Sequence, residues 1–372
     1  GAKIFKYNID DNGNVISYRR IDPKQTEKQP YLFINPFIID PNNENIMYLA
    51  VCSEIYRCKN LNSIELNNDE LNPLETGWEP VKYANSGMLG NYITAIDMPI
   101  YPQDIMFFGT IDGKLFMIEN LLTSPKKTNI TSDLFPKNGY ISSISTNIYN
   151  GNELMITFSN YGVKSVFYSN DRGKTWESIS GNIEENSDGS GSGPGVLCGK
   201  ICNTATKTLY FIGTTCGLYS TETLNGDNTI WYKEGENTMG NNIINMIAYR
   251  PYDGTIAVAT HGNGIFSAKL TPYTYTNKVT GYINDELQIF PNPVIDKFNI
   301  NIYIKQNTNL KISLLNSNGK LITSLYNKPL TIGNHIITFN KNNINGIKIP
   351  NGLYFIKIEF NNKNIISKIL FV

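Results

Sequence analysis

The sequence Ser169-Asn170-Asp171-Arg172-Gly173-Lys174-Thr175-Trp176 lies near the middle of a 372-residue chain and has the composition of a tight turn. Ser169 and Asp171 can form hydrogen bonds with backbone groups inside such a turn, and Gly173 adopts a positive φ angle without steric cost. Trp176 combines a large apolar ring with one polar N–H group, so it can fold back between neighbouring layers of structure. The segment therefore predicts a turn between strands that is anchored by its tryptophan.

The strands around this turn belong to a unit that occurs five times in the first 270 residues. Each copy has an apolar strand, a polar turn, a second apolar strand, another turn and a third strand with aromatic residues. The copies start 62, 48, 55 and 48 residues apart, at Tyr31, Ile93, Ile141, Val196 and Ile244. A period of about 40–50 residues is typical of a four-stranded propeller blade. We therefore predict an all-β fold in which residues 1–270 form a β-propeller.

Five copies leave the number of blades open. Residues 2–20 have the pattern of a hairpin, which would supply the outer strands of a preceding blade. One alternative is a complete six-bladed ring. A second is a seven-bladed ring with a further blade inside the insertion Lys59–Leu89. The third is a propeller truncated at its N-terminus, which the first residue, Gly1, favours.

The central turn also carries a family motif. Residues 169–176 match S-x-D-x-G-x-T-W at every fixed position, and so resemble the Asp-box, or BNR repeat, of sialidase-like β-propellers. A degenerate copy runs from Ser220 to Trp231, and Trp78 occupies the corresponding place in the first repeat. The resemblance implies a structural role for the fixed positions, which are Ser169, Asp171, Gly173, Thr175 and Trp176.

A second domain follows the propeller. Residues 271–287 are polar and are predicted to be a linker. From residue 288 the sequence becomes rich in Ile, Asn and Lys, and about seven short apolar runs alternate with Asn- and Gly-containing turns. Residues 288–372 are therefore predicted to form a small β-sandwich.

The motifs of this tail resemble the type A C-terminal sorting domain of the type IX secretion system of Bacteroidota. The matching positions are Pro291, Asn292, Pro293, Gly319, Gly352, Tyr354 and Lys368. The resemblance implies export across both membranes and recognition of the tail by the outer-membrane secretion machinery. It also implies that the protein is secreted or held at the cell surface.

The composition excludes several classes of protein. Lys plus Arg and Asp plus Glu both number 32, so the net charge is zero, and nucleic-acid binding is not expected. No run of about 20 apolar residues is present, so no transmembrane segment is predicted. With two histidines, His261 and His335, sites that need several neighbouring His ligands are excluded. We expect neither a metal nor a cofactor.

The propeller offers little material for catalysis. Sialidases, which share the Asp-box, need an arginine triad, and the chain has five arginines of which one lies in the turn and two are adjacent. Xyloglucanase-type propeller hydrolases need two carboxylates. Asp97 is the catalytic candidate, and Asp40 is a weaker one. Both are equally typical of turns. We predict a non-catalytic binding or structural scaffold for a glycan or a protein, and the alternative is a glycoside hydrolase of the xyloglucanase-like type.

Overall fold

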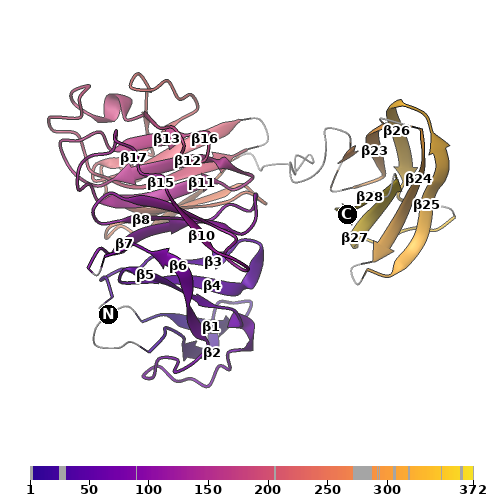
Figure 1. The fold of residues 1–372 in the computed structure, drawn as a ribbon, viewed down its shortest axis with the longest axis horizontal. Helices are drawn as coiled ribbons and strands as arrows, with labels where there is room; N and C mark the ends of the chain where they lie inside the picture. Colours follow the sequence, from indigo (N-terminus) through magenta and orange to yellow (C-terminus); the bar gives the residue numbers. More distant parts are fainter. Residues whose placement is uncertain are drawn as a thin grey trace. The chain divides into compact units, whose positions relative to one another are not determined.

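The computed structural model describes the chain except for residues 1–2, 25–30, 89, 205–206, 271–286, 291, 293, 305–306, 317–318, 345, 361–362 and 372. The chain divides into two compact units, Gly1–Tyr273 and Thr274–Val372 (Figure 1). The segment predicted to be a linker lies outside the described residues, apart from Leu287, which begins a strand. The described residues contain strands and two short 3-10 turns, Leu61–Ser63 and Gly181–Ile183, but no α-helix.

The first unit contains five consecutive antiparallel sheets, which we number as blades 1 to 5. Blades 1 to 4 have four strands each and blade 5 has three, and each strand pairs with the one before it in the chain. The strands of blades 1 and 2 are β3 (Phe37–Asp40), β4 (Asn43–Val51), β5 (Glu54–Cys58), β6 (Trp78–Asn85), β7 (Ile93–Asp97), β8 (Ile105–Thr110), β9 (Leu115–Glu119) and β10 (Lys126–Asn129). Those of blades 3 to 5 are β11 (Ile141–Asn147), β12 (Asn150–Phe158), β13 (Val166–Ser169), β14 (Glu177–Ser178), β15 (Val196–Asn203), β16 (Thr208–Thr214), β17 (Gly217–Thr221), β18 (Tyr232–Glu234), β19 (Ile244–Arg250), β20 (Thr255–Thr260) and β21 (Ile265–Lys269).

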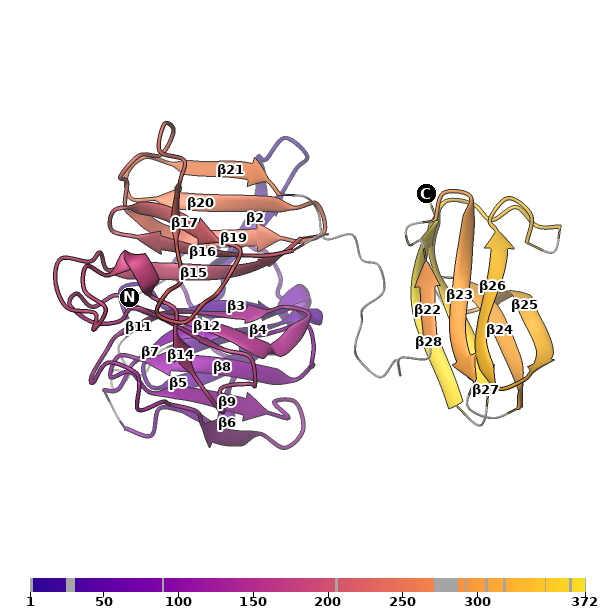
Figure 2. The same cartoon turned by 90° about the horizontal axis from the view of Figure 1, so that it is seen from above.

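The blades pack face to face through their first strands. Strand β7 contacts β3 and β11, and β15 contacts β11 and β19. Figures 1 and 2 show the five sheets following one another along a curved stack. The predicted all-β, propeller-type fold is therefore confirmed.

Strand β8 shows why the strands of the repeats have continuous apolar sequences. Successive side chains of a strand point to opposite faces of its sheet. Phe108 packs toward blade 1 and Phe107 toward blade 3, and neither side chain is exposed to solvent. A blade in the interior of the stack thus buries both of its faces, which removes the alternation expected of a sheet with one solvated face.

The hairpin of β1 (Phe5–Ile9) and β2 (Val15–Arg20) occupies the place of two outer blade strands. In blades 2 and 3 the residue after the fourth strand donates its N–H to the start of the third strand, from Ile130 to Leu115 (3.0 Å) and from Ile179 to Val166 (2.9 Å). The same bond runs from Ile21, which follows β2, to Ile4, which precedes β1 (2.8 Å). Strands β1 and β2 therefore correspond to the third and fourth strands of a blade that precedes blade 1.

The three tryptophans support this equivalence. The indole N–H groups of Trp78, Trp176 and Trp231 donate to the carbonyl groups of Ile21 (2.7 Å), Ile130 (3.1 Å) and Ile179 (2.8 Å). Each tryptophan immediately precedes or begins the fourth strand of its blade, and each acceptor immediately follows the fourth strand of the preceding blade. The predicted common position of the tryptophans is thus a joint between successive blades.

The insertion Lys59–Leu89 does not contain the further blade that one alternative placed there. Its described residues hold a 3-10 turn, an extended segment that bridges Arg19 to Asp69 and Pro23 to Leu74, and then β6 of blade 1. The insertion covers the outer edge of β2. Backbone hydrogen bonds run from Arg20 N–H to Asp69 O and from Asn68 N–H to Tyr18 O.

The first and last blades each leave part of one face exposed. Phe37 and Ile39 on β3 are 53% and 46% exposed, and Met246 and Ile265 on blade 5 are 64% and 75% exposed. Blade 5 also lacks a fourth strand among the described residues. These residues form five blades and half of a sixth, and the number of blades in a closed ring stays a prediction.

The second unit is a two-layered sandwich, as predicted. One sheet has the strand order β22-β23-β26 and the other β25-β24-β27-β28. Their apolar faces enclose one core, in which Phe298, Ile312 and Ile356 are fully buried. The strands are β22 (Leu287–Phe290), β23 (Lys297–Ile304), β24 (Thr308–Asn316), β25 (Leu321–Leu330), β26 (Gly333–Asn340), β27 (Gly352–Phe360) and β28 (Lys363–Phe371).

Candidate functional sites on the propeller and the sorting domain

The turn from Ser169 to Trp176 has the hydrogen bonds that its sequence predicts. The Ser169 hydroxyl accepts the N–H of Gly173 (2.8 Å) and donates to Asp171 Oδ1 (2.8 Å). Asp171 in turn accepts the N–H (2.9 Å) and the hydroxyl (2.6 Å) of Thr175. The side chains of Ser169, Asp171 and Thr175 are therefore bonded to one another or to the backbone of the turn.

Gly173 and Trp176 fix this turn against blade 2. Gly173 has φ +78°, and a Cβ atom at this position would lie 2.7 Å from the side chain of Ile130. The Trp176 ring packs edge-on against Phe135 at 5.1 Å between ring centroids. Gly173 and Trp176 thus connect the turn to blade 2, and the structural role of the five motif residues and their assignment to the Asp-box family stay predictions.

Asp97, the one catalytic candidate, lies at the end of β7 and is 8% exposed. Its Oδ2 atom accepts both the N–H (2.6 Å) and the hydroxyl (2.9 Å) of Thr146 on β11. Asp40 occupies the corresponding end of β3 and accepts the N–H of Asn42 at 2.9 Å. Asp97 is therefore engaged in joining two blades, and Asp40 in closing the turn that follows its strand.

The opposite end of the blades has a different composition. We call it the entry face, because the first strand of each blade begins there and the turns between second and third strands lie beside it. Tyr92 and Tyr140 immediately precede β7 and β11 and occupy equivalent positions, since their carbonyl groups accept the N–H of Ile111 (3.0 Å) and Ser159 (3.3 Å). Tyr161, in the adjoining turn of blade 3, is 66% exposed. Two partly buried tyrosines from neighbouring blades and one exposed tyrosine thus lie at this end of the blades.

Asp112 and Lys114 form an ion pair at the entry face. Burial alone would raise the pKa of Asp112, but hydrogen bonds from Thr110, Lys114 and Asn91 outweigh it and hold the pKa below its usual value. The Thr110 hydroxyl lies 2.5 Å and the Lys114 ammonium 2.9 Å from this carboxylate. The charges of Asp112 and Lys114 therefore compensate one another.

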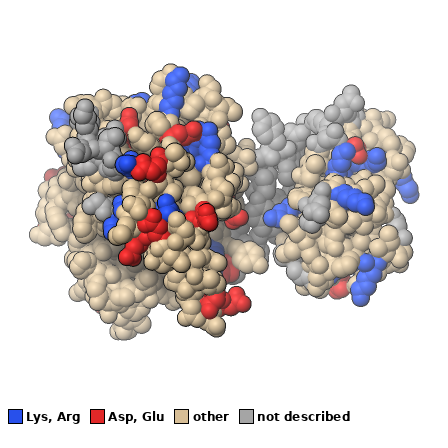
Figure 3. All heavy atoms as spheres, turned by 90° about the horizontal axis from the view of Figure 1, so that it is seen from below, with Lys and Arg blue, Asp and Glu red and all other residues tan. Residues whose placement is uncertain are grey.

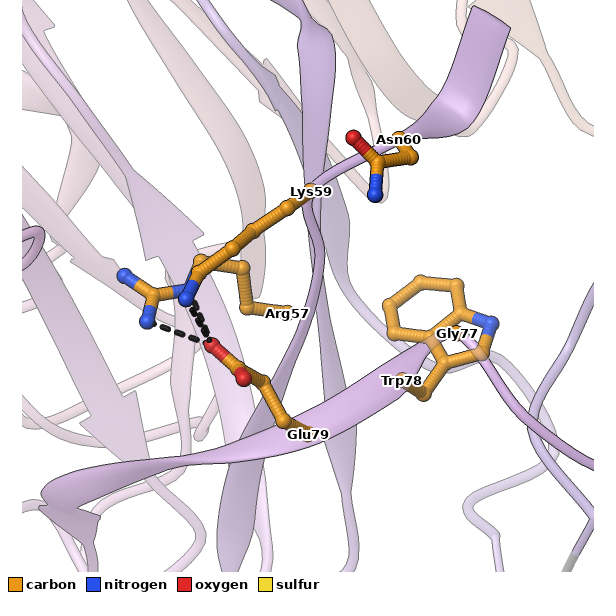
Figure 4. Close-up of a pocket in the computed structure, with 6 residues that line it drawn as sticks. All are labelled: Arg57, Lys59, Asn60, Gly77, Trp78 and Glu79. Atoms are coloured by element: carbon orange, nitrogen blue, oxygen red, sulfur yellow. Dashed lines mark hydrogen bonds and ion pairs between the residues drawn. The ribbon is translucent and has the colours of Figure 1, made fainter. Parts of the chain in front are cut away.

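A pocket of about 240 Å³ lies at the other end of blade 1 and is drawn in Figure 4. Its lining includes two cations, but Glu79 Oε1 bonds to both of them, at 2.6 Å from Arg57 and 2.7 Å from Lys59. The bonds from Lys59 and Arg57 lower the pKa of Glu79, so this carboxylate remains ionised. The pocket therefore offers no unpaired cation to an anionic ligand.

In the second unit the structure brings the described motif residues together at one end of the sandwich, which we call the motif end. The Asn292 side chain donates to the carbonyl of Lys368 (3.0 Å) and accepts the N–H of Leu370 (2.8 Å). Val294 N–H extends the contact to the carbonyl of Leu370 (2.7 Å). Asn292 thus fastens the beginning of the domain to its last strand, while Pro291 and Pro293 lie outside the described residues.

The other motif residues shape the same end. Gly319 has φ +78° in the turn between β24 and β25, and Gly352 has φ +148° where β27 begins opposite Phe371. The Tyr354 ring packs against Phe371 at 5.3 Å between ring centroids. Lys368 contributes its backbone to the Asn292 contact, and its side chain is exposed.

The described residues contain no group of three or more potential metal ligands. None of the helical segments in this part of the chain is long and apolar enough to span a membrane.

Comparison with protein families identifies the tail. Residues 288–372 match the secretion system C-terminal sorting domain. This domain implies export by the type IX system to the cell surface or the medium, and it implies interaction with the secretion machinery. The sequence gives Tyr92 and Tyr140 no motif, and the one signal for them is their position directly before the apolar strands β7 and β11.

Comparison with solved structures gives propeller-like neighbours of low similarity. PorZ, described as an essential surface component of the type IX secretion system of Porphyromonas gingivalis, is 13% identical with a TM-score of 0.31. The match covers 89% of this chain and 58% of PorZ, less than two thirds of its length. The β-propeller domain of Myceliophteria thermophila Cps50 (Swd1) is 14% identical with a TM-score of 0.40, over 70% of this chain and 74% of that one.

A third structure, Raptor of Chaetomium thermophilum, is 10% identical with a TM-score of 0.42, over 94% of this chain and 28% of that one. A search of curated proteins found no match. The propeller architecture of the first unit therefore rests on the strand order and packing described above.

Proposed function

We propose that the exported chain is a non-catalytic binding module whose propeller recognises a glycan or a protein through the entry face. The observation that carries the proposal is the placement of Tyr92 and Tyr140 at equivalent positions of neighbouring blades, with the exposed Tyr161 beside them. Tyrosine offers a large contact area and one polar group, which suits both sugar rings and protein surfaces. The pairing of Asp97 with Thr146 supports a binding role over a catalytic one.

A binding experiment with matched variants tests this proposal. The purified chain is applied to a glycan array, and each hit is measured by calorimetry for the wild type and for Tyr92→Ala with Tyr140→Ala. The control is Tyr232→Ala, which removes a tyrosine that is 63% exposed on the outer strand β18. We expect the double variant to weaken binding at least about tenfold, because truncation of aromatic anchors commonly costs that much, and the control to bind as the wild type does. Equal binding by all three proteins would overturn the assignment of the face.

The hydrolase alternative has its own readout. Xyloglucan and laminarin are incubated with the chain, and the release of reducing ends is measured for the wild type and Asp97→Asn. Release that disappears in the variant would replace the binding proposal by the catalytic one.

A further inference from the structure

The sorting domain has a large positive net charge, although the net charge of the whole chain is zero. Residues 288–372 contain ten lysines and two carboxylates, Asp296 and Glu359, so their net charge is +8. The other 287 residues carry 22 cationic and 30 anionic side chains, so their net charge is −8. In the view of Figure 3, Lys and Arg predominate among the charged residues of the sorting unit.

Four of these lysines belong to the motif end. Lys297 begins β23 and Lys320 lies in the turn that ends β24. Lys348 lies in the segment between β26 and β27, and Lys368 is near the end of β28. The strand register places these positions together, because Gly352 pairs with Phe371, Asn316 with Tyr354 and Lys297 with Asn340.

The four side chains are exposed, and no described carboxylate pairs with any of them. Asp296 is the one acidic residue among the described residues of this end, and its Oδ1 atom is within 3.4 Å of Asn342. The lysine charges therefore lack an internal partner, which sets this end apart from the opposite one, where Glu359 bonds to both Lys311 and Lys357.

Apolar side chains stand among the four lysines. Ile295 is 68% exposed, Leu321 is 59% exposed and Ile347 is 42% exposed, and each is within two residues of one of the lysines. A surface with apolar side chains and a charged surround is the usual composition of a protein interface. The Asn292 bonds and the Tyr354–Phe371 packing fix the end of β28 against the beginning of the domain, which gives the backbone of this end a defined shape.

We propose that the motif end docks on an acidic, partly apolar protein surface of the export machinery, with Lys297, Lys320, Lys348 and Lys368 supplying the complementary charge. Cationic side chains opposite acidic ones steer the encounter and exclude partners of the wrong charge. A protein partner is favoured over a lipid surface because the motif residues give this end a fixed shape, which recognition by an anionic membrane does not require. The proposal is independent of what the propeller binds.

Charge-reversal variants of the full chain test it in a bacterium that has a type IX secretion system. The fraction of the protein outside the cell is measured by immunoblot for the wild type and for Lys320→Glu with Lys348→Glu. The matched control is Lys311→Glu with Lys328→Glu, which changes the net charge equally at positions away from the motif end. We expect the first variant to lower the exported fraction at least about tenfold, and the control to be exported like the wild type. Lys320→Arg with Lys348→Arg keeps the charge and is expected to restore export.

Two further measurements separate the alternatives. Thermal unfolding of the purified variants shows whether a loss of export follows from a loss of folding. If the double variant does not fold, the test is repeated with the separate substitutions Lys297→Glu and Lys368→Glu. Sedimentation with vesicles of phosphatidylglycerol and phosphatidylcholine tests a lipid partner. If the charge-reversal variant loses vesicle binding together with export, the partner is a lipid surface and the proposed protein partner is wrong. If the variant folds and is exported like the wild type, the proposed docking of the motif end is also wrong. A wild type that stays inside the cell would instead contradict the export function itself.

Discussion

Ser169 illustrates how a single side chain determines a turn. Its hydroxyl group is bonded on both sides, to the N–H of Gly173 and to Asp171, and the residue is 2% exposed. The Gly173 N–H is buried, and its acceptor in the structure is the hydroxyl oxygen of Ser169. Removing a partner from a buried donor costs the full desolvation of the donor and not merely the net value of one hydrogen bond.

Ser169→Ala is therefore expected to lower the free energy of unfolding of the propeller by about 1–3 kcal/mol. Urea unfolding followed by tryptophan fluorescence measures the change, since Trp176 lies in the same turn. Ser187→Ala, at an exposed position, is the control and is expected to leave the midpoint unchanged. Equal midpoints for both variants would mean that the hydroxyl does not hold the turn.

Glu184 gives a pH-dependent expectation. This residue is 8% exposed, and burial raises the pKa of its carboxyl group despite the opposing hydrogen bond from Ser165. Because its folded-state pKa exceeds its unfolded-state pKa, the folded protein binds the proton more tightly, and stability falls as pH rises through that interval. Glu184→Gln, which retains an acceptor for the Ser165 N–H (3.0 Å), removes this dependence. The variant is expected to gain stability relative to the wild type as pH rises above about 4, and a difference that does not change with pH would contradict the raised pKa.

At the scale of elements, the innermost strands were the most predictable part of the chain. The repeats predicted strands from Ile93, Ile141, Val196 and Ile244, and β7, β11, β15 and β19 begin at those residues. The first residue of each of these strands is an apolar residue that is fully buried, which makes the start of the strand easy to recognise. The outer strands are short and partly polar, and β14 has only two residues. The pairing of such short outer strands depends on contacts with segments that are distant in the sequence. For this reason the contact of β2 with residues 67–74 could not be predicted.

The same reasoning applies to the sites. The geometry of the Ser169–Trp176 turn is local, and its residue types specify it. The burial of Asp97 depends on Thr146, which is 49 residues away on the next blade, and nothing in the neighbouring sequence signals that bond. The lysine cluster of the motif end required the charge to be counted domain by domain, because the total for the chain is zero.

Strand β1 provides a test at this scale. Strands β9 and β13 hold the third position of their blades and are paired on both edges, whereas β1 is paired with β2 alone among the described residues. Unpaired backbone amides of an edge strand exchange readily with solvent. In hydrogen-exchange mass spectrometry, peptides that cover β1 are expected to exchange at least about tenfold faster than peptides that cover β9 or β13. Equal protection would show that β1 has a second strand partner in solution.

At the scale of the molecule, the two units differ in charge as well as in fold. The blades bury apolar surface between successive sheets, whereas the sorting unit encloses a core of its own. An export domain that is strongly cationic and a cargo that is strongly anionic would interact differently with the same acidic surface. Such a surface would attract the sorting unit and repel the propeller, so the orientation of the chain at the machinery would follow from charge.

This difference predicts the behaviour of the separated units. Proteolysis within residues 271–287 is expected to yield two fragments, which are then applied to ion-exchange columns at pH 7 and low salt. The tail fragment, with a charge near +8, is expected to bind a cation exchanger, and the propeller fragment is expected to bind an anion exchanger. The intact chain, with zero net charge, serves as the reference and should be retained more weakly than either fragment on its own column. A tail fragment that passes through the cation exchanger would mean that its lysines are not free to meet an external anion, and the docking of the motif end on an acidic surface would then lose its physical basis.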